Sequence, residues 1–143
     1  MYEKKVTILL PTYNEANNIA PLLYALKESL TETDASYEIL IIDDSTDETP
    51  QVIAKMRNIY PEVTLIHRPK KRRTGLATAF VEGFGLAKGK YILCMDSDLQ
   101  HPPEIVPRLI EAIAKGDNDI VVATRYRTGG GADGLNTLYR KFA

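Results

Sequence analysis

The sequence predicts an α/β fold, with an open and mostly parallel sheet flanked by helices. Five short apolar, β-branched segments recur along the 143 residues, and amphipathic segments lie between them. Several of the five are continuously apolar, which is typical of parallel strands that are buried on both faces. The alternation β-α-β-α-β-α-β-α-β then predicts strands joined by right-handed crossovers.

The predicted strands are five residues long each. They cover residues 6–10, 38–42, 63–67, 91–95 and 119–123. No apolar stretch approaches the ~20 residues that a membrane-spanning helix needs. The length of the chain suits one domain.

Helices are predicted where apolar residues recur at spacings of three and four, which places them on one helical face. The first such set is Ile19, Leu22, Leu23, Leu26 and Leu30, and a later one is Ile105, Leu109, Ile110 and Ile113. Pro102 and Pro103 suit the first turn of the later helix, where a missing N–H costs little.

Two further helices are predicted from weaker signals. Asp47 or Thr46 is placed to cap a helix that runs to about Tyr60. Residues 77–87 indicate another helix, which Gly83 and Gly85 interrupt.

The composition excludes several classes of protein. A net charge of −1 gives no global cationic field for nucleic acid. The single cysteine, Cys94, can form no internal disulfide and fits a reducing, cytoplasmic setting. His67 and His101 belong to no Cys or His cluster, and neither a Ser-His-Asp pattern nor a Walker-type glycine loop is present. The sequence does not determine the oligomeric state.

Polar segments follow four of the predicted strands. They are residues 11–15, 43–47, 96–100 and 124–127. Because ligands of open α/β sheets bind outside the carboxyl ends of the strands, four polar segments at one edge predict a binding site.

The acidic segment after the fourth strand predicts a metal site. Asp96 and Asp98 are two residues apart, so on an extended segment their carboxylates point the same way. Mg²⁺ and Mn²⁺ prefer oxygen ligands, and Gln100 adds a carbonyl oxygen on the same side. The alternative is an acidic loop that caps the helix after Pro102. The position after a buried strand, with Gln100 in phase, favours the metal site.

Three side chains after the first two strands suit a nucleoside. Tyr13 can stack on a base, Glu15 can bond a ribose hydroxyl, and Asp43 can accept from a base N–H. Each has a structural alternative, which is a half-buried turn tyrosine for Tyr13 and a carboxylate at a helix N-terminus for the other two. The residues alone leave these alternatives open.

Cations and glycines gather in two places. Residues 68–73 hold five cations in six positions, either as a solvated loop or as a contact for a diphosphate or an anionic membrane surface. Arg125 and Arg127 follow the fifth predicted strand directly, which places Arg125 to pair with phosphate oxygens. The glycine run at 129–131 is either the hinge of a closing loop or a linker.

Three strings resemble the signatures of glycosyltransferase family 2, whose fold is GT-A. They read PTYNE at 11–15, DDSTD at 43–47 and DSDLQHPPE at 96–104. The last string, with Arg125, Tyr126 and the glycine-rich loop, is similar to the polyprenyl-phosphate sugar transferases, including the dolichol-phosphate mannose synthases. The resemblance implies a nucleotide-sugar-binding core over residues 1–127. Residues 128–143 are then the loop and the start of a truncated acceptor-side segment.

The resemblance also implies roles for particular residues. The nucleoside would be held by Pro11, Tyr13, Glu15, Ile41 and Asp43. The metal and the diphosphate would be met by Asp96, Asp98 and Gln100, with Ser97 beside them. Asp98, Arg125 and Arg140 would take part in catalysis, the two arginines by facing phosphate or acceptor. The 43–47 string is one residue shorter than the commoner form, which leaves the role of Asp44 undefined.

The implied reaction is an inverting, metal-dependent transfer from GDP-mannose or a UDP-sugar to a polyprenyl or dolichyl phosphate, at the cytoplasmic face of a membrane. Because the acceptor oxygen is already anionic, no general base is required. One alternative is a donor-binding module without turnover, since the family's catalytic domain is about twice as long as this chain. Another is a sugar-phosphate nucleotidyltransferase, which would have a glycine-rich loop after the first strand, where this chain has no glycine.

Overall fold

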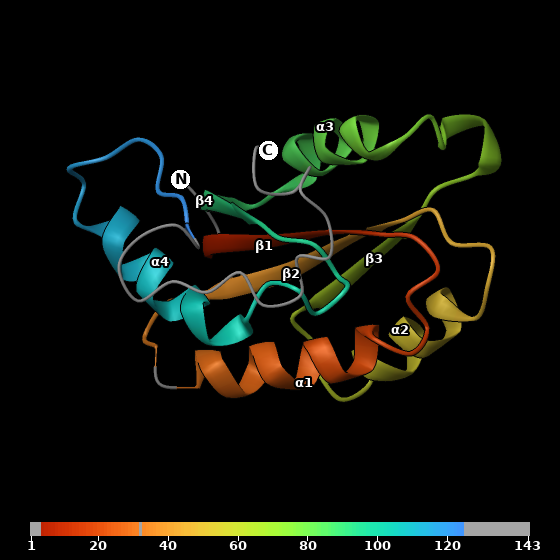
Figure 1. The fold of residues 1–143 in the computed structure, drawn as a ribbon, viewed down its shortest axis with the longest axis horizontal. Coiled ribbons are helices and arrows are strands. Elements are labelled where there is room, and N and C mark those ends of the chain that lie inside the picture. The colour runs from red at the N-terminus through yellow and green to blue at the C-terminus, as the bar shows by residue number, and fades with distance from the viewer. Residues whose placement is uncertain (1–3, 32, 125–143) are drawn as a thin grey trace.

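The computed structural model describes residues 4–31 and 33–124. Its four described strands are β1 (Lys4–Thr12), β2 (Tyr37–Asp43), β3 (Val63–His67) and β4 (Gly89–Cys94). They form one parallel sheet in the order β3-β2-β1-β4 (Figure 1). The predicted fold class, an open parallel sheet flanked by helices, is confirmed.

Helices cover both faces of the sheet. The α-helices are α1 (Ile19–Leu30), α2 (Thr49–Arg57), α3 (Leu76–Leu86) and α4 (Val106–Ala114), and two 3₁₀ turns are η1 (Lys70–Arg72) and η2 (Pro103–Ile105). In Figure 1, α3 lies on one side of the sheet, opposite α1 and α2. The five apolar residues predicted to face the core from the first helix are all buried in α1. The helix predicted to reach about Tyr60 ends earlier, at Arg57.

The glycines of α3 have different surroundings. A Cβ added at Gly83 would lie 2.4 Å from Cδ1 of Leu9 on β1. A Cβ at Gly85 would meet nothing within 4 Å. Gly83, which weakens the helical prediction, is therefore what allows α3 to approach the sheet closely.

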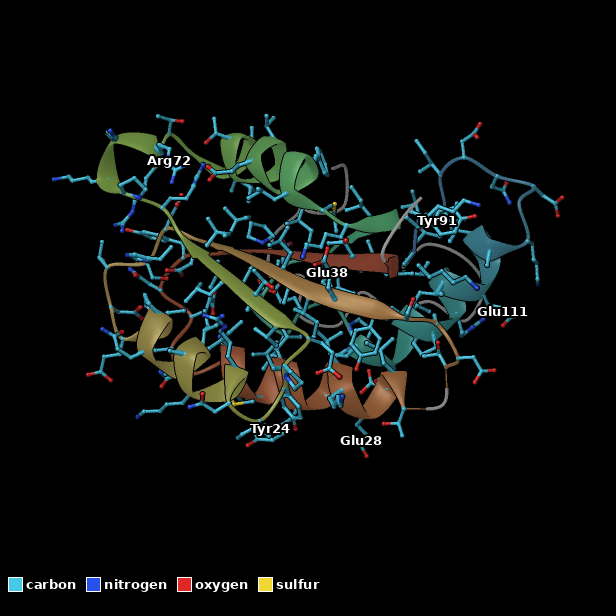
Figure 2. All side chains as sticks on the ribbon, turned by 180° about the vertical axis from the view of Figure 1, so that it is seen from behind. Tyr24, Glu28, Glu38, Arg72, Tyr91 and Glu111 are labelled. Carbon is cyan, nitrogen blue, oxygen red and sulfur yellow. The ribbon has the colours of Figure 1, made fainter. Side chains whose placement is uncertain are left out.

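The amino-terminal part of the sheet contains a buried polar cluster. Thr7 Oγ1 donates to Glu38 Oε1 at 2.6 Å, and the Lys88 backbone N–H donates to the same oxygen at 2.7 Å. The Gly89 N–H in turn donates to Thr7 Oγ1 at 2.9 Å. These bonds connect β1, β2 and the start of β4, so Glu38, at the centre of Figure 2, has a structural role.

The predicted fifth strand is wrong. Residues 120–124 have irregular backbone and pair with no strand in the described part of the chain. Ile120 and Val122 are 79% and 75% exposed. An apolar, β-branched segment forms a strand only where a neighbouring strand accepts its hydrogen bonds and a packed layer covers its side chains. Here the segment has neither.

Candidate functional site

The loops after β1 and β2 are joined to each other. The Asn14 backbone N–H donates to Ser45 Oγ at 2.8 Å, and Asn14 Oδ1 accepts from the Thr46 N–H at 2.9 Å. Asn14 has a φ of +56°, a left-handed conformation that asparagine tolerates better than most residues. Asparagine at this position therefore both makes the turn and connects the two loops.

A second set of bonds connects the same loops at the start of α2. The Glu15 backbone N–H donates to Thr49 Oγ1 at 2.9 Å, and that hydroxyl donates to Asp47 Oδ1 at 2.6 Å. Asp47 also accepts from the Thr49 N–H, and the bond with the Thr49 side chain lowers the pKa of Asp47. Asp47 thus acts at the helix start, as predicted, although Glu48 is the residue at the N-cap position.

A shallow pocket opens beside these loops. It has a volume of about 100 Å³ and is lined by Pro11, Thr12, Tyr13, Ile42, Asp44, Leu76 and Ala79. Ligand pockets commonly measure ~300–1,000 Å³, so this hollow alone is smaller than a typical ligand pocket. Tyr13 is 63% exposed, so it is not a half-buried turn residue, and its ring is free to stack on a ligand.

Two residues predicted to hold the nucleoside, Ile41 and Asp43, are fully buried and do not line this pocket. Ile41 packs in the core between the sheet and α1. Asp43 accepts from Ser45 Oγ through Oδ1 at 2.6 Å, and its Oδ2 lies 2.5 Å from His67 Nδ1. In this structure the Asp43 carboxylate therefore supports the loop from below, and its contact with a base stays a prediction.

His67 was not predicted to take part in the site. It pairs in register with Asp43 across β2 and β3. The Arg73 guanidinium lies 2.8 Å from His67 Nε2. Because a guanidinium can only donate, Nε2 accepts and the ring proton lies on Nδ1, toward Asp43. The sequence held one signal for this contact. His67 is a polar residue at the end of a predicted strand, and Asp43 follows the end of another.

Arg68 differs from the rest of the basic run. It is fully buried, and Nε and Nη2 donate to the two oxygens of Asp44 at 2.7 and 2.5 Å. Nη1 donates to Thr78 Oγ1 on α3 at 3.0 Å. The hydrogen bonds to Asp44 raise the pKa of Arg68. The interpretation of residues 68–73 as a solvated or phosphate-facing run is therefore wrong for Arg68, which fixes Asp44 beside the pocket.

The segment after β4 is held against the first loop. Ser97 is buried, and its Oγ donates to the Pro11 carbonyl oxygen at 3.0 Å. The chain bends from Ser97 to Leu99, and Leu99 has a φ of +62°, so the extended geometry assumed for residues 96–98 is wrong. Asp98 Oδ1 stabilises the bend by accepting from the Gln100 N–H at 3.0 Å.

The same segment offers oxygen ligands. Asp96 is exposed and Asp98 is half-buried, whereas Ser97 between them points inward. No group of three or more His, Cys, Asp or Glu side chains that could hold a metal ion occurs in residues 4–31 and 33–124. Asp96, Asp98 and Gln100 carry oxygens of the kind that a hard cation prefers as ligands. The metal site and its ligands stay a prediction.

Other predicted site residues lie outside the described part of the chain. These are Arg125, Arg140 and the segment 128–143. Their proposed contacts with phosphate or acceptor, and the division of the chain at residue 127, stay predictions.

The fold and the loops define a class of protein. Open parallel α/β sheets that bind nucleotides do so outside the carboxyl ends of their strands, which is where these loops lie. The chain belongs to glycosyltransferase family 2, because residues 7–141 match the model of Glycosyl transferase family 2. This confirms the predicted family and argues against a nucleotidyltransferase.

Curated relatives resemble the chain over almost all of its length. A dolichol-phosphate mannosyltransferase of Pyrococcus furiosus is 41% identical over 138 residues, which are 96% of this chain and 37% of that protein. A dolichol-phosphate mannosyltransferase of Saccharomyces cerevisiae is 36% identical over 137 residues, 94% of this chain and 50% of that protein. The chain therefore spans half or less of the length of these two relatives.

Solved structures confirm the predicted GT-A fold. A mannosyltransferase from Pyrobaculum calidifontis, in complex with GDP-Man and Mn²⁺, has a TM-score of 0.66 and 28% identity, over 85% of this chain and 34% of that one. Glucosyl-3-phosphoglycerate synthase from Mycobacterium tuberculosis, in complex with UDP, has a TM-score of 0.61 over 80% of this chain and 42% of that one. At 22% identity, the second likeness shows the fold alone.

Proposed function

We propose that this chain binds a nucleotide-diphosphate sugar and is part of an enzyme that transfers the sugar to a polyprenyl or dolichyl phosphate. GDP-mannose is the first candidate for the donor and a UDP-sugar the second. The proposal is supported by two relatives named dolichol-phosphate mannosyltransferase and by the fold shared with a mannosyltransferase solved with GDP-Man and Mn²⁺.

One observation carries the proposal more than any other. The buried hydrogen bond from Ser97 Oγ to the Pro11 carbonyl holds the acidic bend against the loop that presents Tyr13. Because Ser97 points inward, Asp96 and Asp98 flank it at the edge of the sheet. A base stacked on Tyr13 and a diphosphate near Asp98 would then belong to one ligand.

The chain's residues would contribute position and electrostatics. When bound, a divalent cation offsets the negative charge that grows on the leaving diphosphate. Asp96, Asp98 and Gln100 would hold that cation, and Tyr13 and Glu15 would hold the nucleoside. The acceptor phosphate oxygen would attack the anomeric carbon from the face opposite the diphosphate, which inverts its configuration. Arg125 and Arg140 would orient phosphate groups.

The substitution Asp98→Asn tests donor binding. Asparagine keeps an oxygen that can accept from the Gln100 N–H, so the bend is preserved while the negative charge is lost. We expect the Mn²⁺-dependent affinity for GDP-mannose, measured by calorimetry, to fall about 10–100-fold or more, because even groups that only support metal ligands have effects of this size.

Glu48→Gln is the matched control, since Glu48 is exposed near the same loops and its side chain makes no capping bond. Its affinity for the donor should equal that of the unmodified chain. An Asp98→Asn protein with undiminished Mn²⁺-dependent affinity would contradict the metal assignment. Parallel titrations with UDP-sugars decide between the two donor classes.

A donor-binding module without turnover is the second candidate function. The observation that favours it is length, since the chain spans 37% and 50% of its two curated relatives. Incubation with labelled GDP-mannose, Mn²⁺ and polyprenyl phosphate separates the two candidates. Lipid-linked sugar identifies a transferase, whereas donor binding without product identifies a module.

The proposed place of action is the cytoplasmic face of a membrane. The membrane in this proposal is supported by the lipid phosphate in the names of the relatives. Within the described residues, no helix combines the length and the apolar character that crossing a bilayer demands.

A further inference from the structure

The outward side of α3 is unusually apolar. The helix turns Ala79 and Gly83 toward the sheet, where both are buried. Its opposite side presents Val81 and Phe84, which are 69% and 50% exposed, and Leu76 is exposed at its start. Large apolar side chains that are exposed together on one surface are typical of a site that contacts a partner or a membrane. The outward side of α3 is therefore expected to have a partner.

Cations surround this helix. Besides Arg68, which is buried and paired with Asp44, residues 68–90 include six Lys and Arg residues and a single carboxylate, Glu82, in a chain whose net charge is −1. Glu82 Oε1 accepts from Arg72 Nη1 at 2.9 Å, which neutralises the one negative charge on the helix. Lys70 and Lys71 are exposed just before α3, and Lys90 is exposed just after it. The partner is therefore expected to be anionic.

The apolar and basic groups lie on the same side of the molecule. In Figure 1, η1 and α3 follow one another along the edge opposite α1 and α2. Figure 2 shows Arg72 beside α3, far from Tyr24 and Glu28 on α1. We call this the α3 surface and define it by its exposed residues Lys70, Lys71, Leu76, Val81, Phe84 and Lys90.

We propose that the α3 surface docks the domain on an anionic lipid bilayer. Apolar side chains flanked by lysines suit the boundary between acyl chains and negatively charged headgroups. A second copy of this chain, placed face to face, would oppose its own cations. Nucleic acid would leave Val81 and Phe84 uncovered.

The docking surface is next to the candidate site. Leu76 belongs to the α3 surface and also lines the pocket that contains Tyr13. If the proposed function is right, docking through α3 brings the donor pocket to the bilayer, where a polyprenyl phosphate resides. The docking itself is independent of donor binding, so the two proposals can be tested separately.

A fluorescent reporter tests the contact directly. The chain has no tryptophan, so Phe84→Trp introduces a single probe on the α3 surface. Vesicles containing phosphatidylglycerol should shift its emission to the blue, and vesicles of phosphatidylcholine alone should not. Ile59→Trp is the control, because Ile59 is 55% exposed and follows α2 on the other side of the sheet. Its emission should stay unchanged with both vesicles.

Vesicle sedimentation measures the strength of docking. Lys70→Ser/Lys71→Ser should weaken partition onto phosphatidylglycerol vesicles by roughly thirtyfold, since each basic residue near an anionic surface contributes about fivefold. Val81→Ser/Phe84→Ser should weaken it by about tenfold or more. The matched control Lys55→Ser/Arg57→Ser removes two exposed cations from α2 and should have little effect.

Several outcomes would overturn the proposal. The first is an absence of partition onto anionic vesicles, and the second is an equal loss of partition for the α2 and α3 double variants. The third is a chain that does not bind vesicles but forms a dimer, which Val81→Ser/Phe84→Ser converts to monomer. Thermal melts establish that each variant is folded. Calorimetry with GDP-mannose and Mn²⁺ on the same variants should give unchanged affinity, which separates failure of docking from failure of donor binding.

Discussion

The two faces of the sheet are covered by different means. On the face of α1, α2 and α4, sixteen buried apolar residues form a continuous core. On the face of α3, the buried apolar cluster has four residues, Leu9, Leu40, Ile42 and Ala79. The hydrophobic effect scales with the apolar area removed from water, so the first face contributes most of the stability.

The α3 face is held instead by a polar network. Arg68 directly follows β3. It donates hydrogen bonds to both carboxylate oxygens of Asp44 and to the Thr78 hydroxyl on α3. Asp44 and Ala79 also line the pocket. One face therefore stabilises the domain, and the other positions the candidate site through directional bonds, which fix geometry more strictly than apolar contacts do.

The largest effect is expected where this network is broken. Arg68→Ala leaves the Asp44 carboxylate without its partner, and removing one member of a buried ion pair costs about 3–5 kcal/mol. Because Asp44 is partly exposed, we expect the lower end, about 3 kcal/mol. Urea denaturation measures the change in the free energy of unfolding.

Two comparisons sharpen this prediction. Arg57→Ala removes an exposed cation from the end of α2 and should change the free energy of unfolding by about 0.5 kcal/mol or less. The double variant Arg68→Met/Asp44→Leu should recover much of the lost stability, because the penalty arises from an unpaired charge. A loss below about 1 kcal/mol in Arg68→Ala would show that the network does not hold the α3 face.

The same contrast explains which parts of the fold the sequence could predict. α1 was predictable from its apolar periodicity, and the strands β1 and β2 from their nearly continuous apolar runs, because these patterns indicate burial from each segment alone. The segment 119–123 has the same local character but pairs with no described strand, since strand formation depends on a neighbour. Gly83 reads as a weak point of a helix, whereas the structure uses it for close packing on Leu9.

The candidate site divides in a similar way. The loops at 11–15, 43–47 and 96–100 were predictable, because the carboxyl ends of parallel strands meet at one edge. Which of the adjacent polar residues in each loop faces the pocket was not predictable, because it depends on which side chain points inward. Asp43 contacts His67 below the loop, while Asp44 lines the pocket. Arg68 resembles its basic neighbours in sequence and is buried in the structure.

The second prediction tests how tightly α3 packs on its small core. Gly83→Ala places a Cβ within 3 Å of Leu9 side-chain atoms, so we expect a destabilisation of about 1–3 kcal/mol. Gly85→Ala, in the same helix with open space around it, should stabilise the domain by about 0.5–1 kcal/mol through helix propensity. Thermal and urea unfolding of the pair measure both changes. Equal effects would mean that α3 moves freely over the sheet.

The smallest expected effect lies at the start of α2, on the opposite face. Asp47 accepts from both the backbone and the side chain of Thr49, so Asp47→Ala should cost about 1 kcal/mol at pH 7.

Because the native pKa of Asp47 is lowered, its ionised form stabilises the fold fully above about pH 4, and this stabilisation is lost as the pH falls through the native pKa. The difference in free energy of unfolding between Asp47→Ala and the unmodified chain should therefore shrink on acidification. Glu48→Ala, whose side chain makes no capping bond, should cost less than Asp47→Ala at pH 7. A difference that is constant from pH 7 to the acid limit would assign the effect of Asp47 to packing or helix propensity, because neither depends on its charge.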